Sequence, residues 1–264
     1  MSKLFIIGNG VDIAHGLKTN YCYFYDYLHS DDEPAKIKAL KSLDDGWNIR
    51  TREDCSDLET KLQYPSNEFK YASDCFNADL SSSQLKDVKE AFISWLNEAY
   101  NLNELKRERI FNISPRDFVV DFNYTDTINE VYDVDINNIY YVHGCIINEL
   151  YGEKIFECPS FNFGIGENCN NKYLMNIRKN TSLNFNKYLS NHKEILNFDE
   201  MQIIGLSFSD GDKNFLRKII SEFNGERIKI YFYSDEDKRR IVSAIEGLSI
   251  NEEKISILDV KEYK

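Results

Sequence analysis

A glycine-rich turn directly after an apolar run is the first feature of the chain that suggests chemistry. Residues 4–7 are all apolar, and they are followed by Gly8, Asn9, Gly10 and Asp12. Glycine allows a tight turn and lets main-chain N–H groups approach an anion with no Cβ in the way. Asn9 or Asp12 can cap the helix that follows or bind a sugar hydroxyl. Because the spacing differs from G-x-G-x-x-G, a purely structural strand-to-helix turn is the alternative.

Small or polar residues also stand at the ends of three later apolar segments: Asn123 after 118–122, His143 after 139–142, and Gly205 with Ser207 at 201–206. The amide of Asn123 offers a donor and an acceptor, and the imidazole of His143 can move a proton near neutral pH. Because the carboxyl ends of parallel strands meet at one edge of a sheet, we expect Gly8 and these residues to line one cleft. The alternatives are a helix cap for Asn123 and a structural role for His143.

The apolar segments that position these residues predict a parallel α/β sheet. Strands are predicted at 3–7, 118–122, 139–142, 161–165, 201–206, 228–233 and 255–260, and the clearest helices at 85–106 and 235–248. Strands that alternate with helices are typical of the Rossmann-like α/β class. We therefore predict a single domain over 1–264. A mainly helical insertion at about 20–114 would follow the first strand, beside the carboxyl edge of the sheet.

Composition and charge exclude several classes of protein. A formal net charge of -12 argues against a nucleic-acid-binding face, since such faces are basic. No apolar run approaches the roughly 20 residues needed to cross a bilayer, and the start of the chain lacks a signal-peptide pattern. We therefore expect a soluble cytoplasmic protein. Six cysteines form no CxxC pair, so no metal site is expected.

Four segments together resemble the bacteriophage abortive-infection AbiH family: "IIGNGVDIAHGLKTNY", "FNYTDT", "VHG" and "GLSFSDGD". The family pattern has IIGNGFD-x-x-x-GLPT-x-Y, FNYT-x-T, HG and GHS-x-x-x-D in the same order. This chain departs from it at Val11, Lys18, Asn129 and Leu206, the last in place of the histidine of GHS. The resemblance implies a role in antiviral defence.

The same segments are similar, more distantly, to the sirtuin-like NAD-binding fold. In that comparison Gly8 and Gly10 match the Gly-rich turn, and Asn123 and His143 match an asparagine and the catalytic histidine. Gly205 and Ser207 match a late G-x-S. Thr125, followed by Asp126, replaces the sirtuin aspartate, and the sirtuin zinc cysteines have no counterpart. The resemblance thus implies a sirtuin-like fold of the kind found in defence proteins that hydrolyse NAD.

The two resemblances imply that NAD or a related nucleotide is the substrate or ligand, and that its N-glycosidic bond is hydrolysed. Asn123 would hold water or a ribose hydroxyl, and His143 would act as general base. The implied nucleotide-binding residues are Gly8, Asn9, Gly10, Asp12, Thr19, Tyr21, Thr125, Asp126, Gly205, Ser207 and Asp210. The alternative is a non-catalytic nucleotide-gated sensor that acts through a second defence protein or a homo-oligomer.

Overall fold

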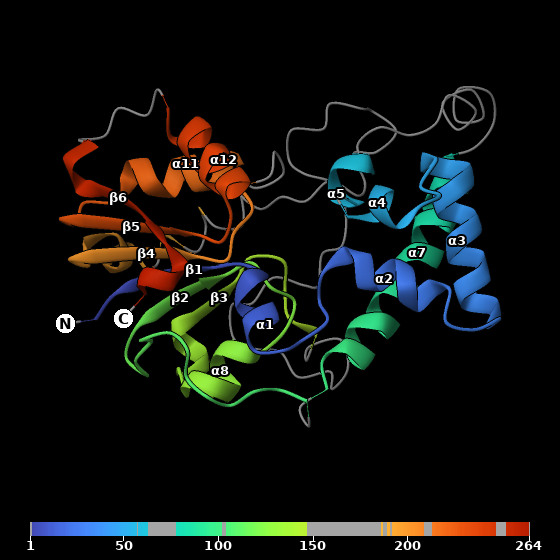
Figure 1. Ribbon diagram of the computed structural model, residues 1–264, viewed down its shortest axis with the longest axis horizontal. Helices are drawn as coiled ribbons and strands as arrows, with labels where there is room; N and C mark the ends of the chain where they lie inside the picture. Colours follow the sequence, from blue (N-terminus) through green and yellow to red (C-terminus); the bar gives the residue numbers. More distant parts are fainter. Residues whose placement is uncertain are drawn as a thin grey trace. The chain divides into compact units, whose positions relative to one another are not determined.

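Short apolar segments form a parallel sheet in the computed structural model of the chain (Figure 1). The strands are β1 (Leu4–Ile7), β2 (Phe118–Asp121), β3 (Ile139–Tyr141), β4 (Glu200–Ile204), β5 (Arg227–Phe232) and β6 (Ile255–Asp259). Their order across the sheet is β3-β2-β1-β4-β5-β6, and neighbouring strands run parallel. This is the strand order of Rossmann-like folds. The predicted α/β class is confirmed, whereas a sirtuin-like fold stays a prediction.

The structure describes residues 2–56, 58–62, 78–101, 104–146, 186, 189–190, 192–208, 213–246 and 252–263. The predicted strand at 161–165 lies outside these residues. The other predicted strands are confirmed with small shifts at their ends. The largest shift is in β4, which was predicted at 201–206 and ends at Ile204.

Both faces of the central strands are buried, as the continuous apolar runs require. On one face, Leu4, Ile6, Ile203 and their neighbours form the main core with α11 (Lys213–Glu222) and α12 (Asp235–Ile245). Figure 1 shows α1 (Gly10–Ala14) and α8 (Thr127–Tyr132) on the other side of the sheet. The short 3-10 helices are η1 (Ile136–Asn138), η3 (Lys193–Asn197), η4 (Glu252–Lys254) and η5 (Val260–Glu262).

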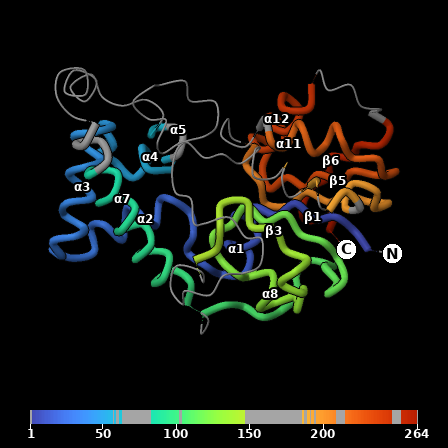
Figure 2. The backbone as a smooth tube through the Cα atoms, turned by 180° about the vertical axis from the view of Figure 1, so that it is seen from behind, coloured from blue at the N-terminus to red at the C-terminus, as the bar shows by residue number. Residues whose placement is uncertain are grey.

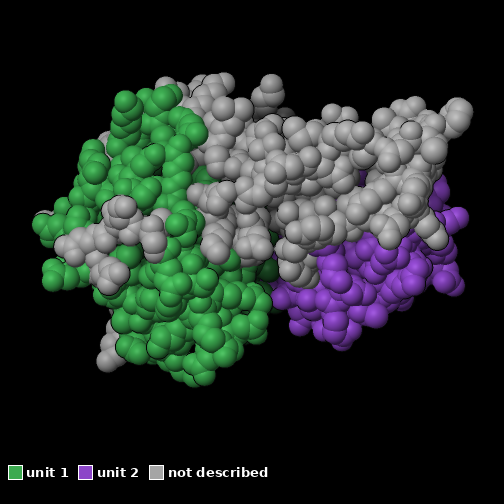
Figure 3. All heavy atoms as spheres, turned by 90° about the horizontal axis from the view of Figure 1, so that it is seen from above, with its two compact units in different colours: residues 1–16, 104–162, 180–264 green, residues 17–103, 163–179 purple. Residues whose placement is uncertain are grey.

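The chain divides into two compact units (Figure 3). The first holds the sheet and comprises residues 1–16, 104–162 and 180–264, and the second comprises residues 17–103 and 163–179. The described helices of the second unit are α2 (Tyr21–Leu28), α3 (Pro34–Trp47), α4 (Arg52–Cys55), α5 (Leu58–Lys61) and α7 (Ala78–Ala99). The described part of 20–114 is therefore mainly helical and contains no strand, and its last residues, 104–114, belong to the first unit. A single domain with this segment as its insertion stays a prediction.

Helices α2, α3 and α7 pack against one another in the second unit, as the view in Figure 2 shows. Phe24 of α2 contacts Phe92 and Trp95 of α7, with ring centroids 5.3 Å apart in both pairs. The helix predicted at 85–106 corresponds to α7, which begins earlier and ends at Ala99. Asn101 follows this end, and asparagine disfavours helix interiors because its side chain competes for backbone groups.

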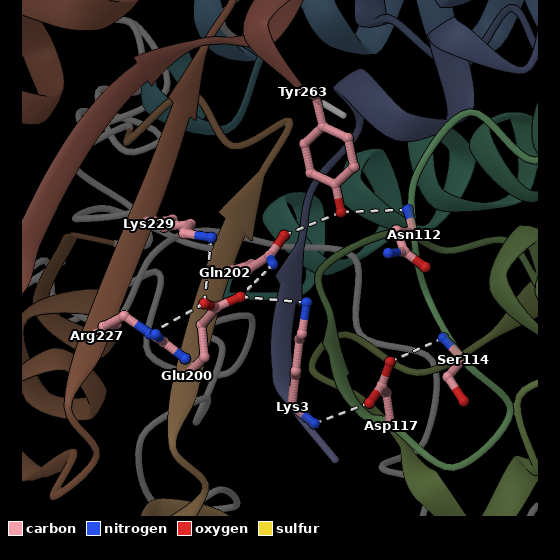
Figure 4. A network of polar contacts seen from close by, with 9 residues as sticks. All are labelled: Lys3, Asn112, Ser114, Asp117, Glu200, Gln202, Arg227, Lys229 and Tyr263. Carbon is pink, nitrogen blue, oxygen red and sulfur yellow. Dashed lines mark hydrogen bonds and ion pairs between the residues drawn. The ribbon is translucent and has the colours of Figure 1, made fainter. Parts of the chain in front are cut away.

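At the amino-terminal end of the strands, a buried carboxylate is surrounded by cations (Figure 4). The side chain of Glu200, at the start of β4, is 3.2 Å from Lys3, 3.3 Å from Arg227 and 3.1 Å from Lys229. The amide Nε2 of Gln202 donates a further hydrogen bond of 2.6 Å to Glu200. The cluster therefore joins Lys3, directly before β1, to the first residues of β4 and β5.

The same network fastens two later segments to this end of the sheet (Figure 4). The hydroxyl of Tyr263 donates to Gln202 Oε1 at 2.9 Å and accepts from the N–H of Asn112 at 3.2 Å. The carboxylate of Asp117 accepts from the N–H of Lys3 at 2.8 Å. These contacts join segments at the amino-terminal end of the strands. Gly8, Asn123, His143 and Gly205 instead follow the carboxyl-terminal ends of their strands.

Candidate functional site

Two loops meet where the order of the strands reverses, between β1 and β4. The N–H of Gly8, after β1, donates to the carbonyl of Ile204 at 2.9 Å, and the N–H of Gly10 donates to the carbonyl of Gly205 at 2.9 Å. In sheets of this topology, ligands bind outside the carboxyl ends of the strands at this reversal point. The first and last sequence motifs are therefore brought together there.

The glycines at this point are required by the contact between the two loops. A Cβ on Gly8 would lie 2.6 Å from the carbonyl oxygen of Gly205, and one on Gly10 would lie 2.7 Å from the Cα of Gly205. Gly205 has φ +75, and a Cβ there would lie 2.8 Å from Gly8 O. The backbones of the loops after β1 and β4 are thus in direct contact. The two N–H groups considered as anion donors in the sequence are already engaged in this contact.

The loop after β4 has an unusual backbone. Gly205 and Phe208 both have positive φ, at 75 and 52 degrees. A positive φ is rare for a bulky residue such as Phe208, whose side chain is buried in the main core. Such conformations persist only where the surroundings impose them, and they are common at functional sites. Ser207 is exposed between these residues, and Asp210 lies outside the described residues.

Leu206 stands where the family pattern has histidine, and it packs over the first loop. A Cβ on Gly8 would lie 2.7 Å from Cγ of Leu206, so the leucine side chain covers that glycine. An apolar group therefore occupies the position in this chain. It can neither accept nor donate a proton, so any proton transfer at this edge depends on other residues.

A buried polar cluster lies beside the glycine turn and joins α1 to the segment after β2. The hydroxyl of Thr125 donates to Asp12 Oδ2 at 2.7 Å, and Asn123 Nδ2 lies 3.5 Å from Asp12 Oδ1. Thr127 extends the cluster, with its hydroxyl 3.2 Å from that of Thr125. The exposed fractions of Asp12, Asn123 and Thr125 are 1%, 4% and 0%. Asp12, Asn123 and Thr125 were all predicted site residues, and the structure places them in contact.

Asp121, the last residue of β2, adds a second carboxyl group to this cluster. Its Oδ1 accepts the N–H of Asn123 at 2.8 Å. Burial, and then the nearby charge of Asp12, raise the pKa of Asp121 well above its usual value. Two buried oxygens, Asp121 Oδ2 and Asn123 Oδ1, have no hydrogen-bond partner among the described residues. Sequence reasoning missed Asp121 because it took the residue as part of a strand; its only signal was an acid at the strand end.

The side chain of Asp126 is hydrogen-bonded to a residue of β3. Asp126 occupies the N-cap position of α8, yet its side chain does not cap that helix. Instead its Oδ1 accepts a 2.5 Å hydrogen bond from the hydroxyl of Tyr141. Burial raises the pKa of Asp126 to about 7, against the opposing effect of the Tyr141 hydrogen bond. The alternative role of Asn123 as the cap of this helix is wrong, because Asp126 is its N-cap residue.

His143 lies after β3, at the same edge of the sheet. Its ring packs edge-on against Phe122, with centroids 5.7 Å apart, and tilted against Tyr124 at 5.6 Å. The side chain is buried, with 3% of its surface exposed. Gly144, with φ 77, turns the chain immediately afterwards. A catalytic role for His143 and a cleft shared with Gly8, Asn123 and Ser207 stay predictions.

Thr19 and Tyr21 belong to the second unit. Tyr21 begins α2, and its ring centroid lies 6.0 Å from that of Phe92 within that unit. Thr19 is buried. Asn9 is the N-cap residue of α1, and its side chain makes no capping hydrogen bond. The nucleotide-binding roles implied for these three residues stay predictions.

Neither a metal site nor a spanning helix is found in the part of the chain that the structure describes. There, no group of three or more His, Cys, Asp or Glu side chains could hold a metal ion. In the same residues, no helix is both long and apolar enough to cross a membrane.

A parallel sheet of order 3-2-1-4-5-6 with helices defines an α/β protein, and this strand order is the one that Rossmann-like folds have. The sequence profile described as bacteriophage abortive infection AbiH matches residues 4–79 and 62–234. These ranges include every residue of the cluster around Asp12 and the loop after β4. The chain therefore belongs to the AbiH family, which indicates anti-phage abortive infection. No curated protein matches the chain.

Proposed function

We propose that this AbiH protein acts in the cytoplasm by binding NAD or a related nucleotide and hydrolysing its N-glycosidic bond. The observation that carries the proposal is the buried Asn123, whose side-chain oxygen has no partner among the described residues. It lies at the carboxyl edge of a Rossmann-like sheet and is held by Asp12. Membership of the family supports the role in abortive infection, and the site supports the chemistry.

The cluster favours the ribose part of a nucleotide. Asn123 Oδ1 is an acceptor without a described partner, and Asp121 Oδ2, which also has none, can accept or, when protonated, donate. A hydroxyl or a water, which can do both, would complete the two groups. A phosphate offers acceptor oxygens and negative charge, which the buried carboxylate of Asp12 would repel. Ribose hydroxyls, in contrast, can donate to each oxygen. We therefore assign the ribose, rather than the diphosphate, to this part of the edge.

The same groups suit the proposed transition state. Cleavage of an N-glycosidic bond passes through an oxocarbenium-like ribosyl cation, which a nearby carboxylate stabilises. In this proposal Asn123 orients the attacking water, and His143 takes its proton. The water oxygen then bonds to the anomeric carbon as nicotinamide leaves in its neutral form.

A nucleotide-gated sensor is the second candidate, and a specific observation favours it. The Gly8 and Gly10 N–H groups are engaged between the loops, and His143 is buried among aromatic rings. A tightly packed edge of this kind suits a protein that responds to a ligand without turning it over. In that case the response would pass to a second defence protein or to another copy of the chain.

The test is release of nicotinamide by the purified full chain. The protein is incubated with NAD, with and without lysate of phage-infected cells, and free nicotinamide is measured by chromatography. We expect release by the native protein and by Asn224→Ala, a control at an exposed asparagine. We expect none by Asn123→Ala. Unchanged NAD in infected cells that are fully protected would overturn hydrolysis and leave the sensor.

A further inference from the structure

Tyr233 is an exposed aromatic residue that lies against the glycine turn. It follows β5, and 41% of its surface is exposed. Its hydroxyl donates to the carbonyl of Gly10 at 3.4 Å. A Cβ on Gly10 would lie 3.1 Å from ring atom Cε2, so the ring reaches this position because Gly10 has no side chain. Sequence reasoning did not include Tyr233 among the site residues.

The ring spans the reversal point of the sheet. β5 pairs with β4, and β4 pairs with β1, whose following loop contains Gly10. Tyr233 therefore extends from the end of β5, past the loop after β4, to the loop after β1. Its backbone follows β5 at one end of the ring, and at the other end its hydroxyl makes a long hydrogen bond of 3.4 Å to Gly10. A ring held in this way loses little conformational freedom when it stacks on a ligand.

Tyr231, which lies in β5 two residues before Tyr233, is a tyrosine with a structural role. Tyr231 is 7% exposed, and its ring packs against Tyr263 with centroids 4.7 Å apart. Tyr233 differs because much of its surface remains open to solvent while its position is fixed. Packing in the core therefore does not account for this aromatic residue.

Acidic residues follow Tyr233 in the chain, and the cation Lys238 lies near them with its Nζ 5.2 Å from the ring centroid of Phe232. Asp235, Glu236 and Asp237 form the first turn of α12, which is capped by Ser234. Glu236 is paired with Arg240 at 2.5 Å, and the carboxylate of Asp237 accepts a hydrogen bond of 2.9 Å from the hydroxyl of Ser234. Acids beside an aromatic face favour a cationic ligand and disfavour a phosphate.

We propose that Tyr233 is a stacking platform for a planar cationic ring, the oxidised nicotinamide ring of the nucleotide. The inference rests on the proposed function, because it assigns a place to one part of the same ligand. The ribose lies toward Asn123 in this arrangement, and the pyridinium ring lies on Tyr233. A positive ring gains from both the face of the tyrosine and the adjacent carboxylates.

Binding of ligands with and without the pyridinium ring tests the platform. The probes are carba-NAD, which has the cationic ring but no hydrolysable glycosidic bond, and ADP-ribose, which lacks the ring. Affinities are measured by calorimetry for the native chain, Tyr233→Leu, Tyr233→Phe and Tyr23→Leu. Tyr23 is a matched control because it is an exposed tyrosine of the second unit, 40% accessible.

We expect Tyr233→Leu to weaken carba-NAD about tenfold and to leave ADP-ribose unchanged, since stacking and cation–π contacts are lost only with the first. Tyr233→Phe keeps the ring and should retain most of the affinity, and Tyr23→Leu should match the native chain. Equal weakening of both probes, or no weakening, would overturn the platform alone. A native chain that binds neither probe would overturn the proposed function as well. Unfolding curves for each variant exclude a folding defect.

Discussion

The hydroxyl of Thr125 donates a 2.7 Å hydrogen bond to the carboxylate of Asp12. Asp12 lies in α1 and Thr125 lies after β2, so this bond joins two segments that are more than a hundred residues apart in the chain. Both side chains are buried, and a buried carboxylate depends strongly on its donors. The bond therefore fixes Asp12 beside Asn123.

Loss of this bond should destabilise the fold. In Thr125→Val the shape is kept, but an oxygen of Asp12 loses its donor. We expect the free energy of unfolding to fall by about 1–3 kcal/mol, measured by urea denaturation. Thr125→Ser keeps the hydroxyl and should lose much less. Equal losses in the two variants would show that the methyl group, rather than the hydrogen bond, matters at this position.

Asp126 should make stability depend on pH. The pKa of Asp126 in the folded state is about 7, above the ordinary 3.8 of an aspartate, because burial outweighs the hydrogen bond from Tyr141. A raised pKa means that the folded state binds the proton more tightly, so this contribution is fully present below about pH 4. It is lost as pH rises through about 7. Asp121, whose pKa is also raised, acts in the same direction.

The matching variant is Asp126→Asn, which is neutral at every pH and keeps an acceptor for Tyr141. Denaturation curves between pH 5 and 8 should show the native chain losing stability as pH rises, by an amount on the order of a few kcal/mol. The variant should show a flatter dependence. A native curve that rises through this range would contradict the assignment of Asp126 as a buried acid.

The sheet was predictable because its strands are local apolar runs. Residues 4–7 and 118–121 are buried on both faces, so their composition alone indicated central parallel strands. Their order in the sheet depends on pairings such as Leu4 with Met201, which no local pattern reveals. The helical character of α7 was likewise predictable from periodicity, although its end at Ala99 was not.

The site was predictable only in part, because its contacts, like the strand order, join residues that are far apart in the sequence. Gly8 and Gly10 were recognised as a turn, but their main contact is with Gly205, almost two hundred residues away, so sequence alone could not show how their N–H groups are used. Asp121 was hidden within an apolar run. Tyr233 was one of many tyrosines, and only its approach to Gly10 in the fold separates it from the core residues.

The contact between the two loops should be intolerant of a side chain. Gly205 and Gly16 both have positive φ, but a Cβ on Gly205 would lie 2.8 Å from backbone atoms, whereas one on Gly16 would have 3.4 Å to its nearest neighbour. Gly16→Ala should therefore cost about 1–2 kcal/mol from the backbone conformation alone. Gly205→Ala should cost a further ~1–3 kcal/mol from overpacking. Chemical denaturation of the two variants measures the difference, and equal losses would mean that the loops can separate at little cost.

His143 provides the sharpest separation of enzyme from sensor. Its ring packs between Phe122 and Tyr124, so alanine would leave a cavity and glutamine is the better substitution. If the site hydrolyses NAD, His143→Gln should reduce nicotinamide release about a hundred- to ten-thousand-fold, as expected for loss of a general base. Affinity for carba-NAD should change little, because the general base acts on the attacking water. Infected cells that carry the variant should keep their NAD and lose protection.

A sensor predicts a different pattern for the same variant. The native chain would bind nucleotide and leave NAD levels steady, and His143→Gln would reduce protection only as far as it reduced affinity. His192→Gln, at a histidine outside the site, is the matched control and should behave like the native chain. NAD levels, affinity and survival are therefore measured together in the three proteins. If NAD stays steady with the native chain as well, loss of protection by His143→Gln at unchanged affinity would contradict both patterns, because neither catalysis nor ligand binding would then account for it.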